Sequence, residues 1–496
     1  MYFKQIARVL SLALVVLLAA AGFSACGETT PAADGGGAAV DDAGGLITGE
    51  PDDENDGPQI FTPNLPEIDW GGRTITFLVR GPEYVEWESQ DIYAEAETGA
   101  PVNDAVFRRN AILEERHNFY IRQVGTSGLQ GRAERSVRSG SNDYDVFMVN
   151  THETNNLALR GNLTSLNALP HFDLSAEWWD QNSIYGFTVE GNTLFMTGDL
   201  SIMPHDATWI MIFNKQLAQD FQVECLYTMV RENRWTVDAM HNIMRNVATD
   251  LDGDGLMRAD DDLFGLVTHD STFDGLFFGM GMRVSSMDAN GRPYLVMNNE
   301  RIINVMQRTI DIMDSDITLN TDPPTIQRVF EENRAFFLGE VLQLVIRLRA
   351  METPFGVLPF PKLDSAQEDF AHMIHPTAAM VSVPISLGDD DKEFAAFVLE
   401  ALAAESRNLL IPAYYTITLE GQQLRDEESA DMLDIILRTR SYDLGYIANW
   451  GNLFSGYVTS VRRGDTDFAS VWERSAEAAL ARMERDIEAY LGGGLD

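Results

Sequence analysis

Trp209-Ile210-Met211-Ile212-Phe213-Asn214-Lys215-Gln216-Leu217 joins a run of apolar residues directly to residues with helical spacing. The apolar run at 209–213 predicts a buried strand, and residues 215–221 predict a helix immediately after it. A strand followed by a helix is the repeating unit of α/β proteins. The segment also restarts a strand-and-helix pattern that has already run through the preceding residues. The sequence therefore predicts two α/β lobes with a cleft between them.

The same pattern extends in both directions from this segment. Further strands are predicted at 74–79, 119–124, 144–149 and 264–268. Helices are predicted at 103–119, 129–139, 155–160, 236–248, 301–313, 326–333, 392–410, 426–438 and 468–490. Strands that alternate with helices predict a mainly parallel sheet covered on both faces. Ligands of such sheets lie beyond the carboxyl ends of the strands, so we expect binding residues in the loops that follow strands.

The first residues predict export. Lys4 and Arg8 precede the apolar run 9–21, which is shorter than the roughly 20 residues needed to span a bilayer and fits a secretory signal peptide. The run ends at Phe23-Ser24-Ala25-Cys26, which resembles the lipobox of bacterial lipoproteins, with Phe23 where leucine is usual. The resemblance implies a signal peptide at 1–25, a diacylglyceryl group on Cys26 and a location at the extracellular face of the cell membrane. The alternative is an ordinary signal peptide with an incidental cysteine.

Residues 26–65 are small, acidic or proline residues without apolar periodicity, which predicts a disordered acidic tether. The 496-residue chain has a formal net charge of −40. This charge argues against nucleic acid as a partner, and also against binding anionic lipid through the protein surface. We therefore expect contact with the membrane through the lipid anchor only. Two cysteines in the whole chain are too few for a framework of disulfides or a cysteine-based zinc site.

One acidic loop has the spacing of a calcium site. In Asp250-Leu251-Asp252-Gly253-Asp254-Gly255-Leu256, carboxylates occupy positions 1, 3 and 5, a glycine occupies position 6, and the Leu256 carbonyl is at position 7. Asp261 falls at position 12, where the calcium loops of EF-hands have glutamate. We expect Asp250, Asp252, Asp254, Leu256 and Asp261 to bind a structural Ca²⁺ ion. The alternative is an acidic turn without metal.

Several segments, in this order along the chain, resemble the family 1 extracellular solute-binding proteins of ABC importers, the maltose-binding type. They are Gly198-Asp199-Leu200 with the segment at 209–217, the aspartate loop followed by Phe264-Gly265-Leu266, the segment from Phe355 to Lys362, and residues 401–406, 411–415 and 425–429. The likeness spans about residues 70–490. No single segment decides it.

The resemblance implies a two-lobed, periplasmic-binding-protein-like α/β fold of type II, with discontinuous lobes, a hinge and an interlobe cleft. It places an N-terminal lobe at 66–200 and 362–420 and a C-terminal lobe at 205–355 and 425–496. It further implies a monomer that captures a small solute, best a sugar or oligosaccharide, by hinge closure and delivers it to the permease subunits of an ABC transporter.

Sugars have hydroxyl groups around rings with apolar faces, so their sites combine flat aromatic side chains with polar ones. The candidate ligand residues are those after predicted strands, near the proposed hinge, or before a late glycine: Glu83, Trp87, Asn150, Asp199, Asp206, Trp209, His269, Phe273 and Trp450. His152, Asp270, Tyr446 and Asn449 lie beside members of this set. Each of these side chains could instead belong to the core or the surface, and of the adjacent Trp178 and Trp179 we expect one in the core.

Two other functions fit the same sequence. A surface glycan-active enzyme would need two carboxylates at a defined separation, and 76 acidic residues make such pairs uninformative. The nucleophile elbow, zinc-protease and phosphate-loop patterns are missing from the sequence, so we expect a protein that is not an enzyme. A cell-surface carbohydrate sensor or adhesin would use the same fold without a transporter.

Overall fold

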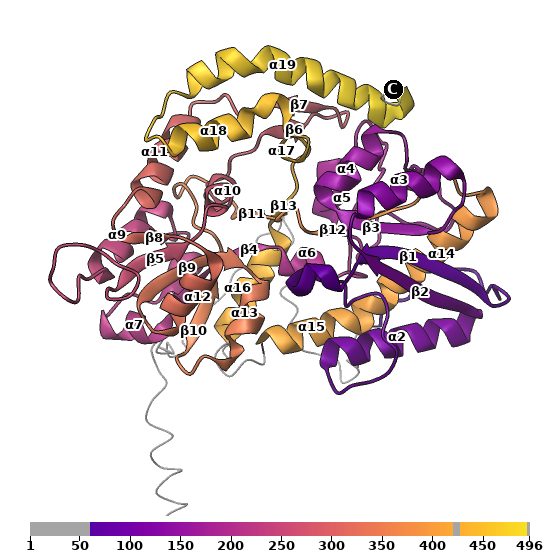
Figure 1. The fold of residues 1–496 in the computed structure, drawn as a ribbon, viewed down its shortest axis with the longest axis horizontal. Coiled ribbons are helices and arrows are strands. Elements are labelled where there is room, and N and C mark those ends of the chain that lie inside the picture. The colour runs from indigo at the N-terminus through magenta and orange to yellow at the C-terminus, as the bar shows by residue number, and fades with distance from the viewer. Residues whose placement is uncertain (1–59, 420–426, 494–496) are drawn as a thin grey trace, which may run out of the picture. The chain divides into compact units, whose positions relative to one another are not determined.

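The computed structural model describes residues 60–419 and 427–493, which belong to one compact unit beginning at Ile60. The predicted signal peptide, Cys26 and the tether up to residue 59 lie outside the described residues. Two large sheets, each covered by helices, organise the described part of the chain (Figure 1). We call the elements around them the first lobe and the second lobe.

The first sheet has the order β12-β3-β1-β2, formed by β1 (Arg73–Arg80), β2 (Phe119–Thr126), β3 (Val146–Asn150) and β12 (Ala379–Ser382). β1 pairs in parallel with β2 and β3, and β12 runs antiparallel to β3. Ile75, Phe77 and Val79 are buried on one face of β1, whereas Leu78 is buried on the other face in a second core. Both faces are therefore apolar, as a strand between two helical layers requires.

The second sheet has the order β10-β4-β9-β5-β8, formed by β4 (Trp209–Asn214), β5 (Phe264–Thr268), β8 (Thr318–Asn320), β9 (Ala335–Val341) and β10 (Phe355–Leu358). β5 is parallel to β8 and β9, whereas β4 is antiparallel to both β9 and β10. The expected mainly parallel sheet is therefore wrong for this lobe, which has a mixed sheet. A strand that is buried on both faces is a continuous run of apolar residues, whether it is parallel or antiparallel to its neighbours. The sequence of β4 therefore does not reveal its direction.

The first lobe has α2 (Pro101–His117) and α14 (Asp389–Asn408) with α15 (Leu410–Leu419) on one side, and α3 (Leu129–Ser139) and α4 (Thr151–Leu159) on the other (Figure 1). The second lobe packs α9 (Val237–Val247), α12 (Pro323–Glu331) and α16 (Glu427–Arg438) on its sheet. Beyond them lie α10 (Thr272–Gly279), α11 (Ile302–Met313), α17 (Leu444–Ile447), α18 (Leu453–Val461) and α19 (Phe468–Glu488).

The short elements are η1 (Pro82–Trp87), η2 (Leu166–Ala168), α5 (Gln181–Phe187), α6 (Met203–Asp206), α7 (Lys215–Asp220), α8 (Leu226–Arg231), β6 (Ser285–Met287), β7 (Pro293–Leu295), α13 (Gln343–Arg347), η3 (Leu348–Ala350), β11 (His372–Met373), β13 (Arg440–Ser441), η4 (Trp450–Asn452) and η5 (Ala489–Gly493). No helix among the described residues is both long enough and apolar enough to span a bilayer.

Side chains at helix starts explain where several helices begin. Thr236 accepts a hydrogen bond from the Ala239 N–H at 3.3 Å and caps α9. Asn150 accepts from the Glu153 N–H at 2.9 Å, so α4 begins at Thr151, four residues before the predicted start. The cap places the first turn of α4 directly beyond the carboxyl end of β3.

The chain passes from the first sheet to the second between β3 and β4, and returns between β10 and β12. The end of the chain also connects the lobes. Tyr490, which follows α19, donates its hydroxyl to Oδ1 of Asn155 in α4 at 2.6 Å, and its carbonyl accepts from Asn192 at 2.5 Å. Each lobe is therefore built from discontinuous segments.

Candidate functional site

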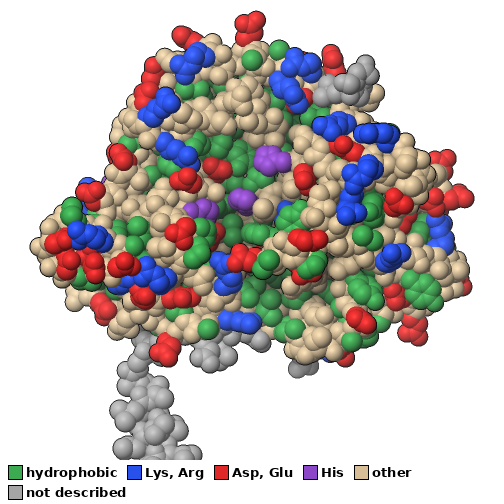
Figure 2. Space-filling view, viewed as in Figure 1, with side chains coloured by type: hydrophobic (Ala, Val, Ile, Leu, Met, Phe, Trp, Pro, Cys, Tyr) green, Lys and Arg blue, Asp and Glu red, His purple; other side chains and the backbone are tan. Residues whose placement is uncertain are grey.

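The carboxyl ends of strands from both sheets carry polar and aromatic side chains that interact with one another. β1 ends at Arg80, β3 is followed by His152, β5 is followed by His269, and Glu340 lies near the end of β9. Trp87, Trp209, His375 and Tyr446 complete the set. We call these eight residues the cleft cluster: Arg80, Trp87, His152, Trp209, His269, Glu340, His375 and Tyr446. Figure 2 shows histidine side chains gathered near the middle of the molecule, beside hydrophobic and acidic surface.

Three contacts define the centre of the cleft cluster. His269 Nε2 lies 3.0 Å from Oε2 of Glu340, and the exposed fractions of these side chains are 20% and 9%. The indole of Trp209 packs against the His269 imidazole with 5.3 Å between ring centroids. Trp87 from the first lobe stacks on His375 with 6.5 Å between centroids and 20° between planes. Both lobes thus contribute rings to one site.

His152 extends the cleft cluster toward the C-terminal elements. Its Nδ1 lies 2.9 Å from the carbonyl oxygen of Ile447, and its ring centroid lies 6.4 Å from that of Tyr446. The Tyr446 hydroxyl donates to Oδ2 of Asp274 at 2.6 Å. Burial raises the pKa of Asp274 to about 6, although the Tyr446 hydrogen bond opposes this shift. The carboxylate keeps the phenol in one orientation at the edge of the site.

Electrostatics keep His375 neutral at neutral pH. Burial lowers its pKa to about 4; nearby Glu340 opposes the shift, while His269, His152 and Arg80 add to it. Nδ1 of His375 lies 2.9 Å from the Thr377 hydroxyl. A neutral imidazole has one donor and one acceptor nitrogen, so it can bind a hydroxyl group in either direction.

The cleft cluster has the composition of a site for a polar ring-shaped molecule. The partly exposed Trp87 indole and Tyr446 phenol provide flat apolar faces, and the imidazoles, Glu340 and Arg80 provide hydrogen-bonding groups around them. Trp209 is fully buried and packs against His269 from the core side. Six of the eight residues lie within two positions of a strand end, whereas Trp87 lies in η1 and Tyr446 in α17.

Several candidates from the sequence come together here. Trp87, Trp209 and His269 belong to the cleft cluster. Phe273 is buried one turn beyond His269, with the Arg462 guanidinium 5.2 Å from its ring centroid. Glu83 is exposed in η1, between Arg80 and Trp87.

Other candidates are engaged with protein groups elsewhere. Asn150 caps α4. Asp199 forms an ion pair with Arg407 at 3.0 Å, and Asp206 accepts from the Tyr414 hydroxyl at 2.7 Å. Trp450 is 1% exposed, and its indole donates to Asp486 at 2.8 Å. Trp178 and Trp179 are both buried and both donate to Glu400, at 3.1 and 3.0 Å.

Four residues at or beside the site were missed from the sequence: Arg80, Glu153, Glu340 and His375. The signal for Arg80 was available, because a charged residue ends the apolar run of β1. Glu340 and His375 also lie near strands, but recognising this requires β9 and β12, and the sequence predicts neither strand. His375 lies in the segment that returns to the first sheet, four residues before β12.

The aspartate loop lies between α9 and β5, apart from these contacts. One carboxylate oxygen each from Asp250, Asp252 and Asp254 lie within 4.8 Å of one another, a spacing suited to a cation. Arg258 forms an ion pair with Asp254 and lies 4.0 Å from Asp252. Asp261 is exposed and outside this group, whereas Asp262 is buried and accepts from the N–H groups of Leu251 and Arg258 at 2.9 and 2.7 Å.

The backbone of the aspartate loop also accounts for its shape without an ion. Asp250 accepts from the N–H groups of Gly253 and Gly255, both at 2.7 Å, and the Leu256 N–H donates to Asp254 at 2.8 Å. Gly253 and Gly255 have φ of 75° and 83°, which few other residues adopt. Three of the five expected ligands are therefore gathered, and Asp261 is not among them.

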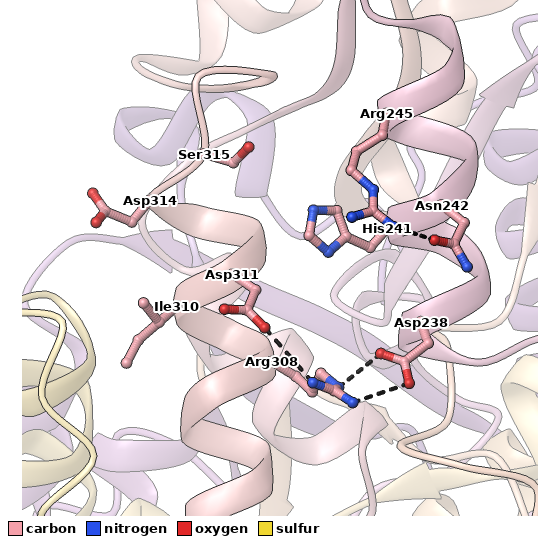
Figure 3. A pocket seen from close by; sticks show the side chains of 9 residues that line it. All are labelled: Asp238, His241, Asn242, Arg245, Arg308, Ile310, Asp311, Asp314 and Ser315. Carbon is pink, nitrogen blue, oxygen red and sulfur yellow. Dashed lines mark hydrogen bonds and ion pairs between the residues drawn. The ribbon is translucent and has the colours of Figure 1, made fainter.

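Two surface cavities lie away from the cleft cluster. One of about 750 Å³ lies between α9 and α11 (Figure 3), and another of about 450 Å³ lies between α18 and α19. The first is lined by charged groups that pair with each other: Arg308 lies 2.7 Å from Asp238 and 3.7 Å from Asp311. Neither cavity lies at the carboxyl end of a strand in the two large sheets, so the cleft cluster remains the candidate site.

Comparison with solved structures identifies the fold. A cyclo/maltodextrin-binding protein complexed with maltotetraose is similar with a TM-score of 0.53 and 12% identity, over 85% of this chain and 98% of that one. M. tuberculosis UspC is similar with a TM-score of 0.53 and 15% identity, over 82% and 100%. A sugar transporter from Rhizobium etli in an open conformation is similar with a TM-score of 0.51 and 13% identity, over 84% and 99%.

This chain has the periplasmic-binding-protein-like fold. The two-lobed architecture with discontinuous lobes, a hinge and an interlobe cleft, expected from the sequence, is confirmed. No family model matches the sequence, and no curated protein matches it either. The cleft cluster lies near strand ends of both sheets, the region where open α/β sheets bind ligands.

Proposed function

We propose that this protein is the solute-binding component of an ABC importer and that its solute is a sugar or oligosaccharide. The observation that carries the proposal is the cleft cluster, in which rings and hydrogen-bonding groups from both lobes lie at the strand ends of a binding-protein fold. Aromatic faces complement the apolar faces of sugar rings, and imidazole, carboxylate and guanidinium groups complement hydroxyls. The arrangement supports capture between the lobes by hinge closure, with release to permease subunits and without catalysis.

The similar structures support the same class of solute. One of them is complexed with maltotetraose, and another, an ABC substrate-binding protein from Listeria monocytogenes, is in complex with cycloalternan. That second protein is similar with a TM-score of 0.50 and 13% identity, over 85% of this chain and 99% of that one. These identities are low, so they support the class of solute and leave the individual sugar to experiment.

Binding is tested by thermal shift and calorimetry on the full-length protein in a detergent without a sugar headgroup. The panel is maltose, maltotetraose, cellotetraose, xylotetraose and mannotetraose. A sugar that binds only the folded state raises the unfolding midpoint as its concentration exceeds Kd. We expect at least one sugar to raise the midpoint and to be recovered unchanged. The proposal is contradicted if no sugar of the panel raises the midpoint or if a sugar is cleaved.

The location is part of the proposal. A lipid on Cys26 and the acidic tether would hold the binding unit at the extracellular face of the membrane, as a monomer with its cleft free to meet solute and permease. Intact-mass analysis of the membrane-extracted protein tests this, with an expected diacylglyceryl thioether on Cys26. The C26A variant should be found in the medium. Detection of Cys26 in a disulfide would count against the anchor.

We also propose that the aspartate loop binds a structural Ca²⁺ ion through Asp250, Asp252 and Asp254, with Leu256 and Asp261 as the further ligands expected from the spacing. The clustered carboxylates repel one another without a cation, which supports the proposal, and the ion pair of Arg258 with Asp254 competes with it. The ion would fasten the end of α9 to the start of β5.

A further inference from the structure

Arg80 is a buried cation without a full set of partners. Its side chain lies at the carboxyl end of β1 and the residue is only 4% exposed. Its Nη1 atom is buried and has no hydrogen-bond partner among the described residues. The guanidinium carbon lies 5.4 Å from the centroid of the Tyr84 ring in η1. Leaving a buried charged donor unsatisfied is costly, which indicates that another molecule supplies the acceptor.

A buried acceptor without a partner lies in the first turn of α4. Oε2 of Glu153 is buried and accepts no hydrogen bond from the described residues. Asn150 caps this turn and thereby fixes the position of Glu153 next to His152. Burial lowers the pKa of Arg80 and raises the pKa of Glu153, and the attraction between the two groups opposes both shifts. Arg80 ends β1, and Glu153 lies in the helical turn directly after β3, the parallel neighbour of β1. The unsatisfied donor and the unsatisfied acceptor therefore lie at neighbouring strand ends.

Arg109 is a buried arginine whose guanidinium nitrogens all have acceptors within the protein. It is fully buried, and its Nε, Nη1 and Nη2 donate to Asn110, Ser406 and Ile92 at 3.0, 2.9 and 3.0 Å. Each nitrogen of that guanidinium therefore has an acceptor within the protein. Arg80 is similarly buried, but its Nη1 has no acceptor within the described part of the protein. The stability of the fold alone therefore explains the position of Arg80 poorly.

We propose that Arg80 and Glu153 bind one hydroxyl group of the solute and select an uncharged sugar over a sugar acid. This inference rests on the proposed function and names the chemistry of its solute. A hydroxyl oxygen accepts from the guanidinium while its hydrogen is donated to the carboxylate, so one group satisfies both atoms. A carboxylate on the solute would satisfy Arg80 alone and would face Glu153.

The charges around the cleft favour an uncharged solute for a second reason. Glu340 and Asp274 add carboxyl groups to the same cleft, and His375 is neutral at neutral pH. The nearby cation Arg462 is already paired with Asp270 at 2.8 Å. A negatively charged sugar would therefore lie near more carboxylates than unpaired cations. The free energy needed to remove water from its charge would be poorly compensated by attraction to the protein.

The test uses three variants of the full-length protein: R80M, E153Q and, as the matched control, R109M. Removing a charged hydrogen bond to the solute should weaken binding about ten-fold or more for R80M and several-fold for E153Q. Calorimetry is carried out with the neutral sugar of the panel that binds the wild type, and with tetragalacturonate as the acidic counterpart. Thermal unfolding without solute is measured on the same samples.

We expect R80M to unfold close to the wild-type midpoint, because Nη1 of Arg80 has no hydrogen bond within the described residues to lose, and R109M to unfold well below it. A lowered midpoint for R80M comparable to that of R109M would overturn the inference, as would unchanged binding by both R80M and E153Q. Tighter binding of tetragalacturonate than of every neutral sugar would also overturn it while leaving sugar binding intact. If neither class of sugar binds the wild type, the proposed function fails, and this inference with it.

Discussion

Trp87 and Trp450 are both tryptophans that the sequence marks as candidates, yet their surroundings differ. Trp87 is partly exposed in the cleft and stacks on His375, whereas Trp450 is buried and bonded to Asp486. A residue that contacts solute is expected to affect affinity, and a residue inside the core is expected to affect stability. Sequence spacing alone cannot separate the two, because both tryptophans lie in short loops or turns with similar polar neighbours.

For W87A we expect sugar affinity to fall about ten-fold, with little change in the unfolding midpoint, because a stacking surface is removed from the cleft. For W450A we expect a loss of about 3–5 kcal/mol in stability, because a large buried side chain is deleted. Calorimetry and denaturant unfolding measure the two effects. Y120A, at an exposed tyrosine of β2, is the control for removing a surface ring. Equal affinity of W87A and wild type would contradict the assignment of Trp87.

Asp206 gives the protein a pH dependence of stability. Burial raises its pKa to about 7 from an ordinary value of 3.8, although the Tyr414 hydrogen bond opposes the shift. The folded state therefore holds its proton at a pH where the unfolded state has released it, so stability falls as pH rises from about 4 through 7. Burial raises the pKa of Glu400 to about 7 and adds to this trend. Buried His375 acts oppositely, but only below about pH 6.5.

Between pH 6.5 and 8 we therefore expect the unfolding midpoint to decrease, and the D206N variant to show a smaller decrease than the wild type. D316N, at an exposed aspartate, removes the same charge without removing a buried carboxyl group and should follow the wild type. Differential scanning calorimetry across this range gives both slopes. A slope of D206N identical to that of the wild type would show that Asp206 is ionised throughout.

At the scale of elements, β10 packs against β4 so closely that one residue must be glycine. A Cβ atom at Gly356 would lie 2.8 Å from Cζ of Phe213 and still closer to the Tyr227 hydroxyl. We expect G356A to destabilise the protein by about 1–3 kcal/mol, because the added methyl group overpacks a rigid strand pair. G388A, where the nearest atom to a Cβ is 3.9 Å away, is the matched control. Denaturant unfolding of G356A with the wild-type midpoint would contradict this packing.

The aspartate loop is an element whose stability should depend on calcium if the proposed ion binds. We expect Ca²⁺ to raise the unfolding midpoint and a chelator to lower it, and the D252N/D254N double variant to lose the response. The D316N variant should respond to calcium as the wild type does. An equal midpoint with calcium and with chelator would show that Arg258 and the backbone N–H groups are sufficient to shape the loop.

The sequence predicts helices and strands well where a single local pattern determines the structure. Five apolar strands and the capped helix α9 were found at nearly the observed bounds, because continuous apolar runs and Thr236 are strong local signals. β9 and β12 were missed because each follows a segment that reads equally well as helix or loop. The direction of β4 was also not predictable, since pairing depends on residues more than 100 positions away in β9.

At the scale of the whole molecule, η1 of the first lobe touches α13. Arg347 forms an ion pair with Glu86, and the Gln343 amide donates to the Glu86 carbonyl. Removing the Glu86 side chain in E86A should accelerate dissociation of a bound sugar by about two- to five-fold, because an exposed ion pair contributes little. R349A, at an exposed arginine nearby, is the control. Stopped-flow dissociation that is unchanged in E86A would show that this contact does not hold the lobes together.

The stacking of Trp87 on His375 has an optical consequence. An imidazole beside an indole quenches its fluorescence, and the quenching changes when the imidazole is protonated or when another molecule separates the rings. Trp87 is partly exposed at the place where a solute would enter, Trp70 and Trp472 are partly exposed elsewhere, and the other five tryptophans are buried. The protein therefore carries its own emission signal for occupancy of the cleft, readable without a dye or a label.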